Sequence, residues 1–258
     1  MTIPDSWIAD CANDLKASVA FLTRLPVAAV AGATPAAGAD ISRAAWAFPL
    51  AGVLVALIAA VVYAVAHKIG SPPWVAAALA VAATLAVTGC LHEDGLADTA
   101  DGFGGGDTRE RKLEIMRDSR IGTYGVCALT LSILLRVSAI ASLGNPIVVL
   151  WALIAAHGGA RAAMPVFMAL VPPARRDGLA FAAGRPSGDR VITASVLGIL
   201  ILAIGLGPML GIAALIFLLV AIVLMAWLSV VQIDGQTGDV LGAVEQVSEI
   251  VILLVALR

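Results

Sequence analysis

The sequence predicts an all-α integral membrane protein with about six or seven transmembrane helices and an N-terminal amphipathic helix. Of its 258 residues, 60% are hydrophobic and only 13% are charged, whereas soluble domains average about 45–50% apolar and about 25% charged residues. The apolar residues gather in stretches close to the roughly 20 residues that a helix needs to cross a bilayer. The lipid bilayer is therefore an expected partner, and the net charge of −2 gives no sign of nucleic acid as another.

The N-terminal segment has apolar residues at helical spacing, with acids and a lysine on the remaining face. These apolar residues are Trp7, Ile8, Cys11, Leu15, Val19 and Leu22. Acids stand where a secretory signal peptide would have basic residues, so a signal peptide is not expected. A helix in the membrane interface and a short cap on the helix bundle both fit this pattern.

Seven stretches approach the length of a membrane span: 45–66, 73–89, 125–143, 147–170, 191–207, 209–231 and 240–257. Prolines 72 and 73 suit a helix start, and Gly207-Pro208 predicts a tight turn between the fifth and sixth stretches. The last stretch carries Glu245 and Glu249, which suits a buried or re-entrant helix better than one that faces lipid. A single membrane domain over residues 1–258 is expected.

Basic residues gather in alternate connections of this pattern. The loops 90–124 and 171–190 are rich in Arg and Lys, and the N-terminal segment adds three more, whereas the opposite set of connections offers only Lys68 and Arg258. Cytoplasmic loops of membrane proteins carry an excess of Lys and Arg. The N-terminus and the loops 90–124, 171–190 and 232–239 are therefore expected in the cytoplasm.

The loop 90–124 has the clearest chemical signal. Asp94, Asp98 and Asp101 are spaced i, i+4, i+7, which puts them on one face of a helix. Like charges at this spacing repel, and a divalent cation relieves that repulsion. Oxygen ligands without a Cys/His cluster suit Mg²⁺ or Mn²⁺, with Glu93 and His92 nearby for second-shell or proton-transfer roles. A solvated acidic surface is the alternative.

A glycine run at 102–106 and a basic segment follow the acids. The glycines let the backbone approach a ligand, although a flexible hinge explains them equally well. A cytoplasmic helix is expected at about 108–120, with Asp107 or Thr108 as its cap and Gly122 just past its end. Its arginines, Arg109, Arg117 and Arg120, can face anionic groups, or they can simply follow the positive-inside rule.

Two arginines, Arg136 and Arg161, lie within predicted spans. A charge at that depth is costly, so each is expected to face the bundle interior and to have a partner. Glu245 and Glu249, one turn apart, are the expected partners, as a structural pair or beside bound substrate. His157 is expected to pack or to form hydrogen bonds inside the bundle.

Five segments together resemble one family, the bacterial cobalamin synthases, also called adenosylcobinamide-GDP ribazoletransferases. These segments are FLTRLPV at 21–27, LHEDGLADTADG at 91–102, LEIMRDSRIG at 113–122, RRDGL at 175–179 and QTGDVLGA at 236–243. The resemblance spans nearly the whole chain. Gly89-Cys90 and Asp234-Gly235 depart from it, because paired glycines are expected at both places.

The resemblance implies a phosphotransfer reaction. Adenosylcobinamide-GDP reacts with α-ribazole, or with its 5′-phosphate, to give adenosylcobalamin or its phosphate together with GMP, and Mg²⁺ is required. The resemblance also implies a multi-pass protein of the bacterial cytoplasmic (inner) membrane with its active site on the cytoplasmic side.

The site expected from the residues and from the resemblance has three parts. Metal ligands are expected among Glu93, Asp94, Asp98 and Asp101. Catalytic roles are expected for His92, Asp98, Asp101, Arg117 and Arg120. Substrate contacts are expected from Arg24, Gly104, Gly105, Ser119, Arg175, Arg176 and Asp239.

Two other functions fit parts of the pattern. A membrane prenyltransferase also holds Mg²⁺-diphosphate with aspartates, but it needs two such motifs on opposed helices, and the segment from Asp234 to Asp239 is a thin second one. The charges inside the spans suggest a transporter, although most acids lie in loops and no inverted repeat of broken helices is visible.

Overall fold

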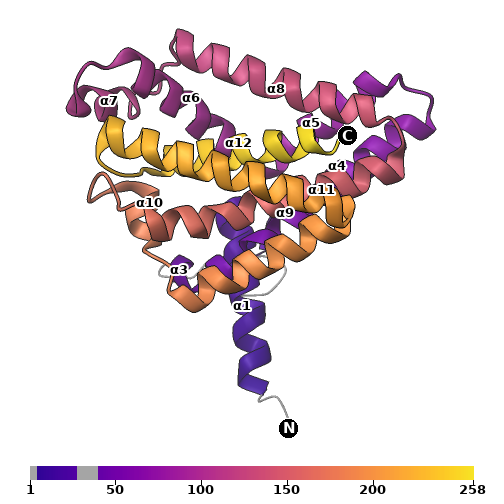
Figure 1. Ribbon diagram of the computed structural model, residues 1–258, viewed down its shortest axis with the longest axis horizontal. Coiled ribbons are helices and arrows are strands. Elements are labelled where there is room, and N and C mark those ends of the chain that lie inside the picture. The colour runs from indigo at the N-terminus through magenta and orange to yellow at the C-terminus, as the bar shows by residue number, and fades with distance from the viewer. Residues whose placement is uncertain (1–4, 28–39) are drawn as a thin grey trace.

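The computed structural model describes residues 5–27 and 40–258 (Figure 1). In this part of the chain the regular elements are all helices, without a strand. The helices, in chain order, are α1 Asp5–Leu22, α3 Ile41–Ala44, the 3₁₀ helix η1 Ala45–Ala47, α4 Phe48–Lys68, α5 Pro73–Thr88, α6 Leu91–Gly105, α7 Arg109–Ile115, α8 Thr123–Leu143, α9 Pro146–Leu170, α10 Gly178–Ala183, α11 Gly188–Ile233 and α12 Gly238–Val255. The all-α membrane fold is confirmed.

Four helical segments in the described part of the chain are long and apolar enough to cross a membrane. They are Ile41–Lys68, Thr123–Leu143, Pro146–Leu170 and Gly188–Ile233, and the bent pair of α5 and α6 makes a fifth if it counts as one span. The seven expected stretches correspond to α4, α5, α8, α9, α11 and α12, with two of them joined in α11. Helix α12 is not among the candidate spans and is buried in the bundle, as its two glutamates suggested.

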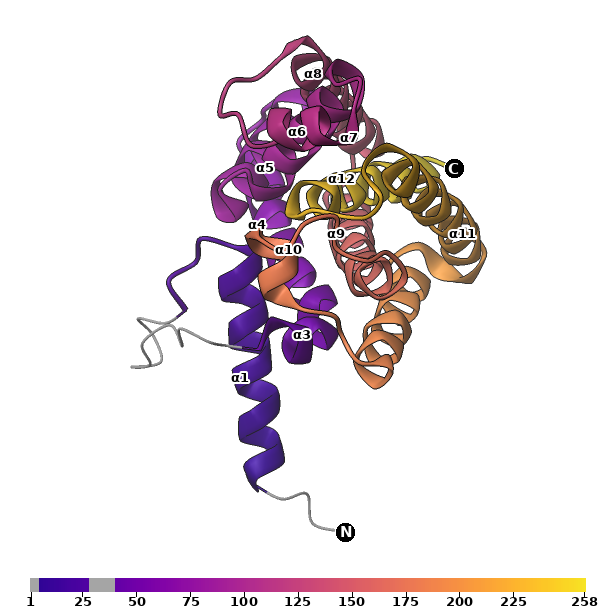
Figure 2. The ribbon, with the colours of Figure 1, turned by 90° about the vertical axis from the view of Figure 1, so that its left-hand side faces the viewer.

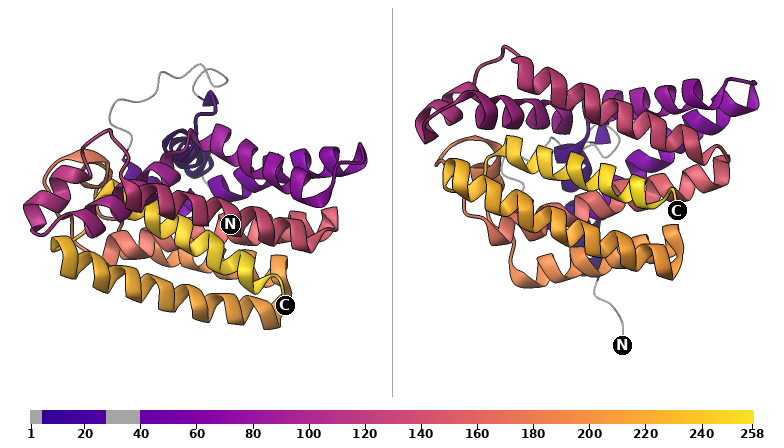
Figure 3. Two further views of the ribbon diagram at one scale, coloured as in Figure 1. Left: turned by 90° about the horizontal axis from the view of Figure 1, so that it is seen from above. Right: turned by 45° about the horizontal axis from the view of Figure 1, so that its top comes forward.

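Helix α11 folds back on itself at Gly207, as expected from the sequence. Gly207 has φ 77° and ψ 164°, which is not helical, and Pro208 follows it. A Cβ on Gly211 would lie 3.1 Å from Cα of Ala203, so the two legs pack closely just beyond the turn. The two legs are visible in Figure 3.

A bend of 90° separates α5 from α6. Helix α5 has 16 residues, about 24 Å at 1.5 Å per residue, which is short of the roughly 30 Å of bilayer hydrocarbon. Gly89 and Cys90 both adopt the left-handed conformation, with φ 64° and φ 58°. Two successive left-handed residues end α5 and send α6 off in a new direction, beside α8 and opposite to it in sense.

Helix α9 lies at the centre of the bundle, between α4, α11 and α12 (Figures 1 and 2). Its middle is built of alanine and glycine and is fully buried. A side chain at Gly52 of α4 would overlap the carbonyl of His157. Small residues at such crossings let membrane helices approach closely and gain van der Waals contact.

Helix α1 packs against the bundle through its second half, while its first half extends away from the body (Figure 2). Asp14 is buried on the packed face, where it accepts a hydrogen bond from Nε1 of Trp46 at 3.0 Å and pairs with Arg43 at 2.8 Å. The expected N-terminal helix is therefore present, and residues 14–22 cap one side of the bundle.

The basic segment after the glycine run forms a shorter helix than expected. Helix α7 begins after Thr108, whose hydroxyl accepts from the amide of Arg111 as the predicted cap, but it ends at Ile115 instead of at about 120. The carboxylate of Asp118 accepts from the backbone amide of Arg120 and turns the chain there. Gly122, expected to end this helix, instead precedes α8 as its N-cap.

Candidate active site

The acidic face of α6 is the starting point of the site. Asp94, Asp98 and Asp101 do lie on one helix, with Asp94 exposed, Asp98 half-buried and Asp101 buried. The negative charges of Asp94, Asp101 and Asp239 all act on Asp98, and Arg175 is the cation that opposes them. Negative charge therefore exceeds positive charge around Asp98, which favours binding of a cation.

Asp239 reaches this face because α12 and α6 touch. A Cβ on Gly95 would lie 2.7 Å from the backbone oxygen of Asp239, so only glycine permits this approach. The contact brings the first turn of α12 beside Asp94 and Asp98. Burial raises the pKa of Asp239, and Arg175, 3.6 Å from its Oδ2, acts in the opposite direction.

A chain of ion pairs joins the segment that follows α7 to this face. Arg117 contacts Oδ2 of Asp177 at 2.6 Å. Nε of Arg175 lies 3.4 Å from Oδ1 of the same carboxylate, and its NH2 reaches Asp239. Arg117, Arg175 and Asp239, all predicted site residues, are thus brought together. Asp177, which links them, was not predicted, although it stands in the quoted RRDGL segment.

The three loops that carry charge contact one another. Arg109 donates to the carbonyl of Ile233 at 3.1 Å and to that of Ala174 at 2.5 Å, and pairs with Asp234 at 3.2 Å. The amide of Ala174 donates to the carbonyl of Gln236 at 2.8 Å. Arg109 therefore ties α7 to both other loops, at the left-hand end of the bundle in Figure 1.

Asp101 stabilises the start of α8, a role that the sequence did not predict. Its Oδ2 accepts from the amide of Gly122 at 2.7 Å, and its Oδ1 accepts from the amide of Gly125 at 2.9 Å. A carboxylate in this position satisfies free N–H groups at the start of α8 and complements the positive end of the helix dipole. Asp94 and Asp98 are therefore the acids of this face best placed to bind a ligand.

Arg120 and Ser119 lie at the surface. The guanidinium of Arg120 bonds to Asp118 at 2.6 Å, and its side chain is 86% exposed. Hydrogen bonds from Arg120 hold the pKa of Asp118 at about 2. Arg120 thus pairs with a neighbour in its own loop, whereas Arg117, which is also exposed, pairs with Asp177 of another loop.

The remaining predicted substrate contacts have different surroundings. Gly104 and Gly105 are the last residues of α6, so they do not form a loop, and a Cβ on Gly104 would meet the ring of Tyr124. The amide of Arg24 donates to the carbonyl of Val87 at 2.7 Å, and its side chain lies over Gly89 at the bend. Arg176 is exposed.

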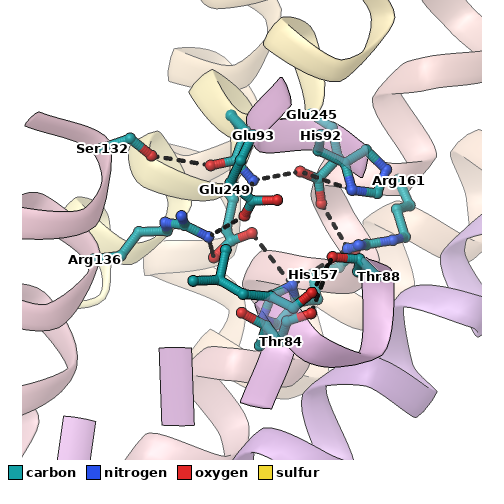
Figure 4. A network of polar contacts seen from close by, with 12 residues as sticks. Thr84, Thr88, His92, Glu93, Ser132, Arg136, His157, Arg161, Glu245 and Glu249 are labelled. Atoms are coloured by element: carbon teal, nitrogen blue, oxygen red, sulfur yellow. Dashed lines mark hydrogen bonds and ion pairs between the residues drawn. The ribbon is translucent and has the colours of Figure 1, made fainter. Parts of the chain in front are cut away.

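A second polar cluster lies inside the bundle, where α6, α8, α9 and α12 meet (Figure 4). It contains three glutamates, two arginines and two histidines: Glu93, Glu245, Glu249, Arg136, Arg161, His92 and His157. Arg161 contacts Oε1 of Glu245 at 2.6 Å, and Arg136 lies 3.6 Å from Oε1 of Glu249. Both arginines therefore have the partners expected from the sequence, and His157 is buried within the cluster.

His92 and Glu93 belong to this buried cluster. Glu93 pairs with Arg136 at 2.9 Å, and Nδ1 of His92 lies 3.9 Å from Oε2 of Glu245. Neighbouring residues on a helix point about 100° apart, so a helix that presents Asp94 outward turns Glu93 toward α8. In this structure Glu93 thus points away from the acidic face where it was expected to bind metal.

The described part of the chain brings one set of three potential metal ligands within 4.8 Å of one another: His157, Glu245 and Glu249. Arg161 and Arg136 already pair with these carboxylates, so the set reads as an ion-pair network. Asp94 and Asp98 offer fewer ligands but a better match to Mg²⁺. In phosphoryl-transfer sites this ion is commonly bound by one or two carboxylates together with substrate phosphates.

Comparison with known proteins decides the family. The family model described as cobalamin-5-phosphate synthase matches residues 14–257. The chain belongs to this family. A relative from Bradyrhizobium diazoefficiens is 57% identical over 243 residues, 94% of this chain and 92% of the relative. One from Mesorhizobium japonicum is 49% identical, over 95% of this chain and 92% of the relative. Both relatives are named adenosylcobinamide-GDP ribazoletransferase.

Membership of the cobalamin-5-phosphate synthase family makes the chain a transferase of cobalamin synthesis. The match covers every element that builds the site, from the second half of α1 to α12. No solved structure matches the chain.

Proposed function

We propose that this enzyme transfers the adenosylcobinamide-phosphate group of adenosylcobinamide-GDP to α-ribazole or its 5′-phosphate, releases GMP, and requires Mg²⁺. The observation that carries the proposal is the meeting of the acidic face of α6 with the ion-pair chain from Arg117 to Asp239. A diphosphate substrate needs both a cation and arginines, and this end of the molecule offers arginines and carboxylates that could hold the cation.

The acidic and the basic residues have different roles in this proposal. Asp94 and Asp98 hold Mg²⁺ together with oxygens of the diphosphate. Bound Mg²⁺ neutralises charge on the phosphates and orients them. Arg117 and Arg175 stabilise the charge that builds on departing GMP, because a guanidinium can contact two phosphate oxygens at once. A carboxylate of the acidic face accepts the proton of the attacking hydroxyl.

The proposed location is the cytoplasmic side of the bacterial inner membrane. The loops that carry the site are the most basic of the chain, and basic loops stay in the cytoplasm. The water-soluble substrates then reach the site without crossing the bilayer.

The direct experiment measures product identity with purified protein in detergent, supplied with adenosylcobinamide-GDP and α-ribazole. GMP and adenosylcobalamin should form with Mg²⁺ and not with excess EDTA, and parallel reactions with α-ribazole 5′-phosphate give the acceptor preference. Turnover in detergent would exclude a transporter. Release of diphosphate without GMP would instead support a prenyltransferase.

The structure weakens the prenyltransferase alternative. That function needs a second aspartate motif opposite the first. Of the two candidates, Asp234 pairs with Arg109 at 3.2 Å. Only Asp239 then faces Asp94 and Asp98 across the contact between α6 and α12, and a single carboxylate is not a second motif.

A further inference from the structure

The acidic face can act only if α6 is held at the right rotation about its axis. We infer that Arg136, inside the membrane bundle, is a positioning residue that sets this rotation through its ion pair with Glu93. The inference rests on the proposed function, since it assigns Arg136 an effect on the Mg²⁺ site at Asp94 and Asp98.

The two residues beside Asp94 fix α6 against two different helices. Glu93 points toward α8, where it contacts NH1 of Arg136 at 2.9 Å. Gly95 points toward α12, where its backbone meets that of Asp239. Since neighbours on a helix point about 100° apart on either side, these two contacts leave Asp94 directed out between α8 and α12, toward Asp239.

A second contact between α6 and α8 lies at the far end of the acidic face. Asp101, eight residues after Glu93, accepts the amides of Gly122 and Gly125. Eight residues correspond to about 12 Å along the axis. The two contacts to α8 therefore bracket Asp98, and losing either would free α6 to rotate or tilt.

The contact between Glu93 and Arg136 fixes the orientation of α6 near its N-terminal end. Glu93 and Arg136 are both buried, and Gln246, held by Ser132 at 2.9 Å, donates to the same oxygen of Glu93 at 3.1 Å. A buried charge that loses its partner becomes strongly unfavourable. Without Arg136, Glu93 would have to move toward water and take α6 with it.

A matched ion pair in the same cluster provides the control. Arg161 and Glu245 are as deeply buried and contact each other at 2.6 Å, but they join α9 to α12. Their connections to α6 are indirect, through His92, 3.9 Å from Glu245, and through Gln246, which donates to Glu245 at 3.0 Å and to Glu93 at 3.1 Å. Loss of Arg161 should therefore perturb the bundle to a similar degree without releasing Glu93.

The experiment compares Arg136→Met, Arg136→Lys and Arg161→Met as purified, folded proteins. The readouts are the Mg²⁺ concentration for half-maximal GMP release, kcat at saturating Mg²⁺ and, without turnover, the affinity for Mn²⁺ measured by electron paramagnetic resonance, which should weaken wherever the Mg²⁺ requirement rises. Arg136→Met should raise the Mg²⁺ requirement about 10- to 100-fold, the usual range for residues that orient metal ligands. Arg136→Lys, which keeps the positive charge, should raise the Mg²⁺ requirement less than Arg136→Met does. Arg161→Met should stay within about twofold of wild type.

An unchanged Mg²⁺ requirement in Arg136→Met would overturn the inference, and so would an equal rise in Arg161→Met. If Arg136→Met does not fold, Glu93→Ala removes the same contact from the side of α6, leaves Arg136 its second partner Glu249 at 3.6 Å, and should raise the Mg²⁺ requirement in the same way; no rise there would equally overturn the inference. Wild-type GMP release without Mg²⁺ would instead contradict the proposed function, and the inference with it.

Discussion

At the scale of single residues, partners divide the charged side chains into two groups. In the buried cluster each arginine pairs with a glutamate: Arg136 pairs with Glu93, and Arg161 pairs with Glu245. At Asp98 the neighbouring charges are mostly of the same sign. A buried charge that loses its partner is strongly unfavourable, so removing one member of either pair should destabilise the bundle. The arrangement at Asp98 lowers the stability of the bundle until a cation arrives, which is typical of a binding site.

Neutralising Asp98 should therefore harm ligand binding more than folding. Asp98→Asn is expected to keep wild-type thermal stability without Mg²⁺, because it relieves repulsion, and to lose the stabilisation that Mg²⁺ gives. At a Mg²⁺ concentration 100 times its Kd that stabilisation is about 2.7 kcal/mol. Thermal unfolding in detergent with and without Mg²⁺ measures it. Asp107→Asn, an exposed acid nearby, should behave as wild type, and full activity of Asp98→Asn would remove this acid from the metal site.

Arg117 and Arg120 should differ although they are three residues apart. Arg117 reaches Arg175 and Asp239 through Asp177, whereas Arg120 pairs locally with Asp118. Arg117→Lys should slow GMP release about 10²-fold, because an ammonium does not reproduce the forked contact that stabilises developing charge. Arg120→Lys should release GMP at nearly the wild-type rate. Near-wild-type rates for both variants would assign Arg117 to membrane topology.

The sequence predicted partners for some residues and not for others. Arg136 and Arg161 had to find acids because an unpaired charge within a span is too costly, and Glu245 and Glu249 were the acids at similar depth. The roles of Asp101 and Asp177 depend on which backbone amides and arginines the fold brings near them. Spacing along the chain carries no such information.

At the scale of elements, two backbone turns stand out. Among the described residues, Cys90 and Asp234 are the only non-glycine residues with positive φ, at 58° and 56°. They are also the two places where paired glycines were expected. Cys90 forms the bend between α5 and α6, and Asp234 ends α11 just before the segment that leads to Asp239. Each turn sets the direction of a segment that carries candidate site residues. Each adopts the left-handed conformation although its residue is not glycine.

Cys90→Gly should stabilise the protein. A left-handed residue with a Cβ costs roughly 1–2 kcal/mol, and the greater freedom of glycine in the unfolded chain takes back roughly 0.5–1 kcal/mol. The melting temperature in detergent should rise by about 2–4 °C, the usual effect of about 1 kcal/mol on a chain of this size. Asp234→Gly should gain less, because it also loses the contact with Arg109. A lower melting temperature for Cys90→Gly would contradict this account of the bend.

Elements with strong apolar patterns were predicted well. The stretches 125–143 and 147–170 correspond to α8 and α9, and the turn at Gly207-Pro208 is present. The polar segments were predicted less well. Helix α6 continues through the glycines to Gly105, and α7 stops at Ile115. Their ends depend on packing against Tyr124 and on the contact of Asp118 with Arg120, which the helical period does not encode.

At the scale of the whole molecule, the segments that follow α6, α9 and α11 lie at one end of the bundle (Figures 1 and 3). Together these segments are rich in Arg and carry the candidate site. The opposite end holds short connections, where the hydroxyl of Tyr63 donates to the carbonyl of Gly144 at 3.1 Å. The sequence predicted this segregation from the positions of Lys and Arg. It did not predict that α6 would bring its acids alongside α12, because that contact follows from the bend at Gly89 and Cys90.

The orientation in the membrane can be tested with introduced cysteines in a background where Cys11, Cys90 and Cys127 are replaced by Ala. Asp107→Cys and Ser187→Cys, at the basic end, should be protected from an impermeant thiol reagent in intact cells and labelled after permeabilisation. Lys68→Cys, at the other end, should be labelled in both. The reverse pattern would place the site outside the cytoplasm.

The most direct test of the account asks where the divalent cation binds. Mn²⁺ takes the same oxygen ligands as Mg²⁺ and is visible by electron paramagnetic resonance. With adenosylcobinamide-GDP present, wild-type protein should bind Mn²⁺ and release it to excess Mg²⁺. A variant with both Asp94→Asn and Asp98→Asn should lose the bound signal, whereas Glu249→Gln, which alters the buried set of His157, Glu245 and Glu249, should keep it. Loss of the signal in Glu249→Gln and its retention in the double variant would contradict the account.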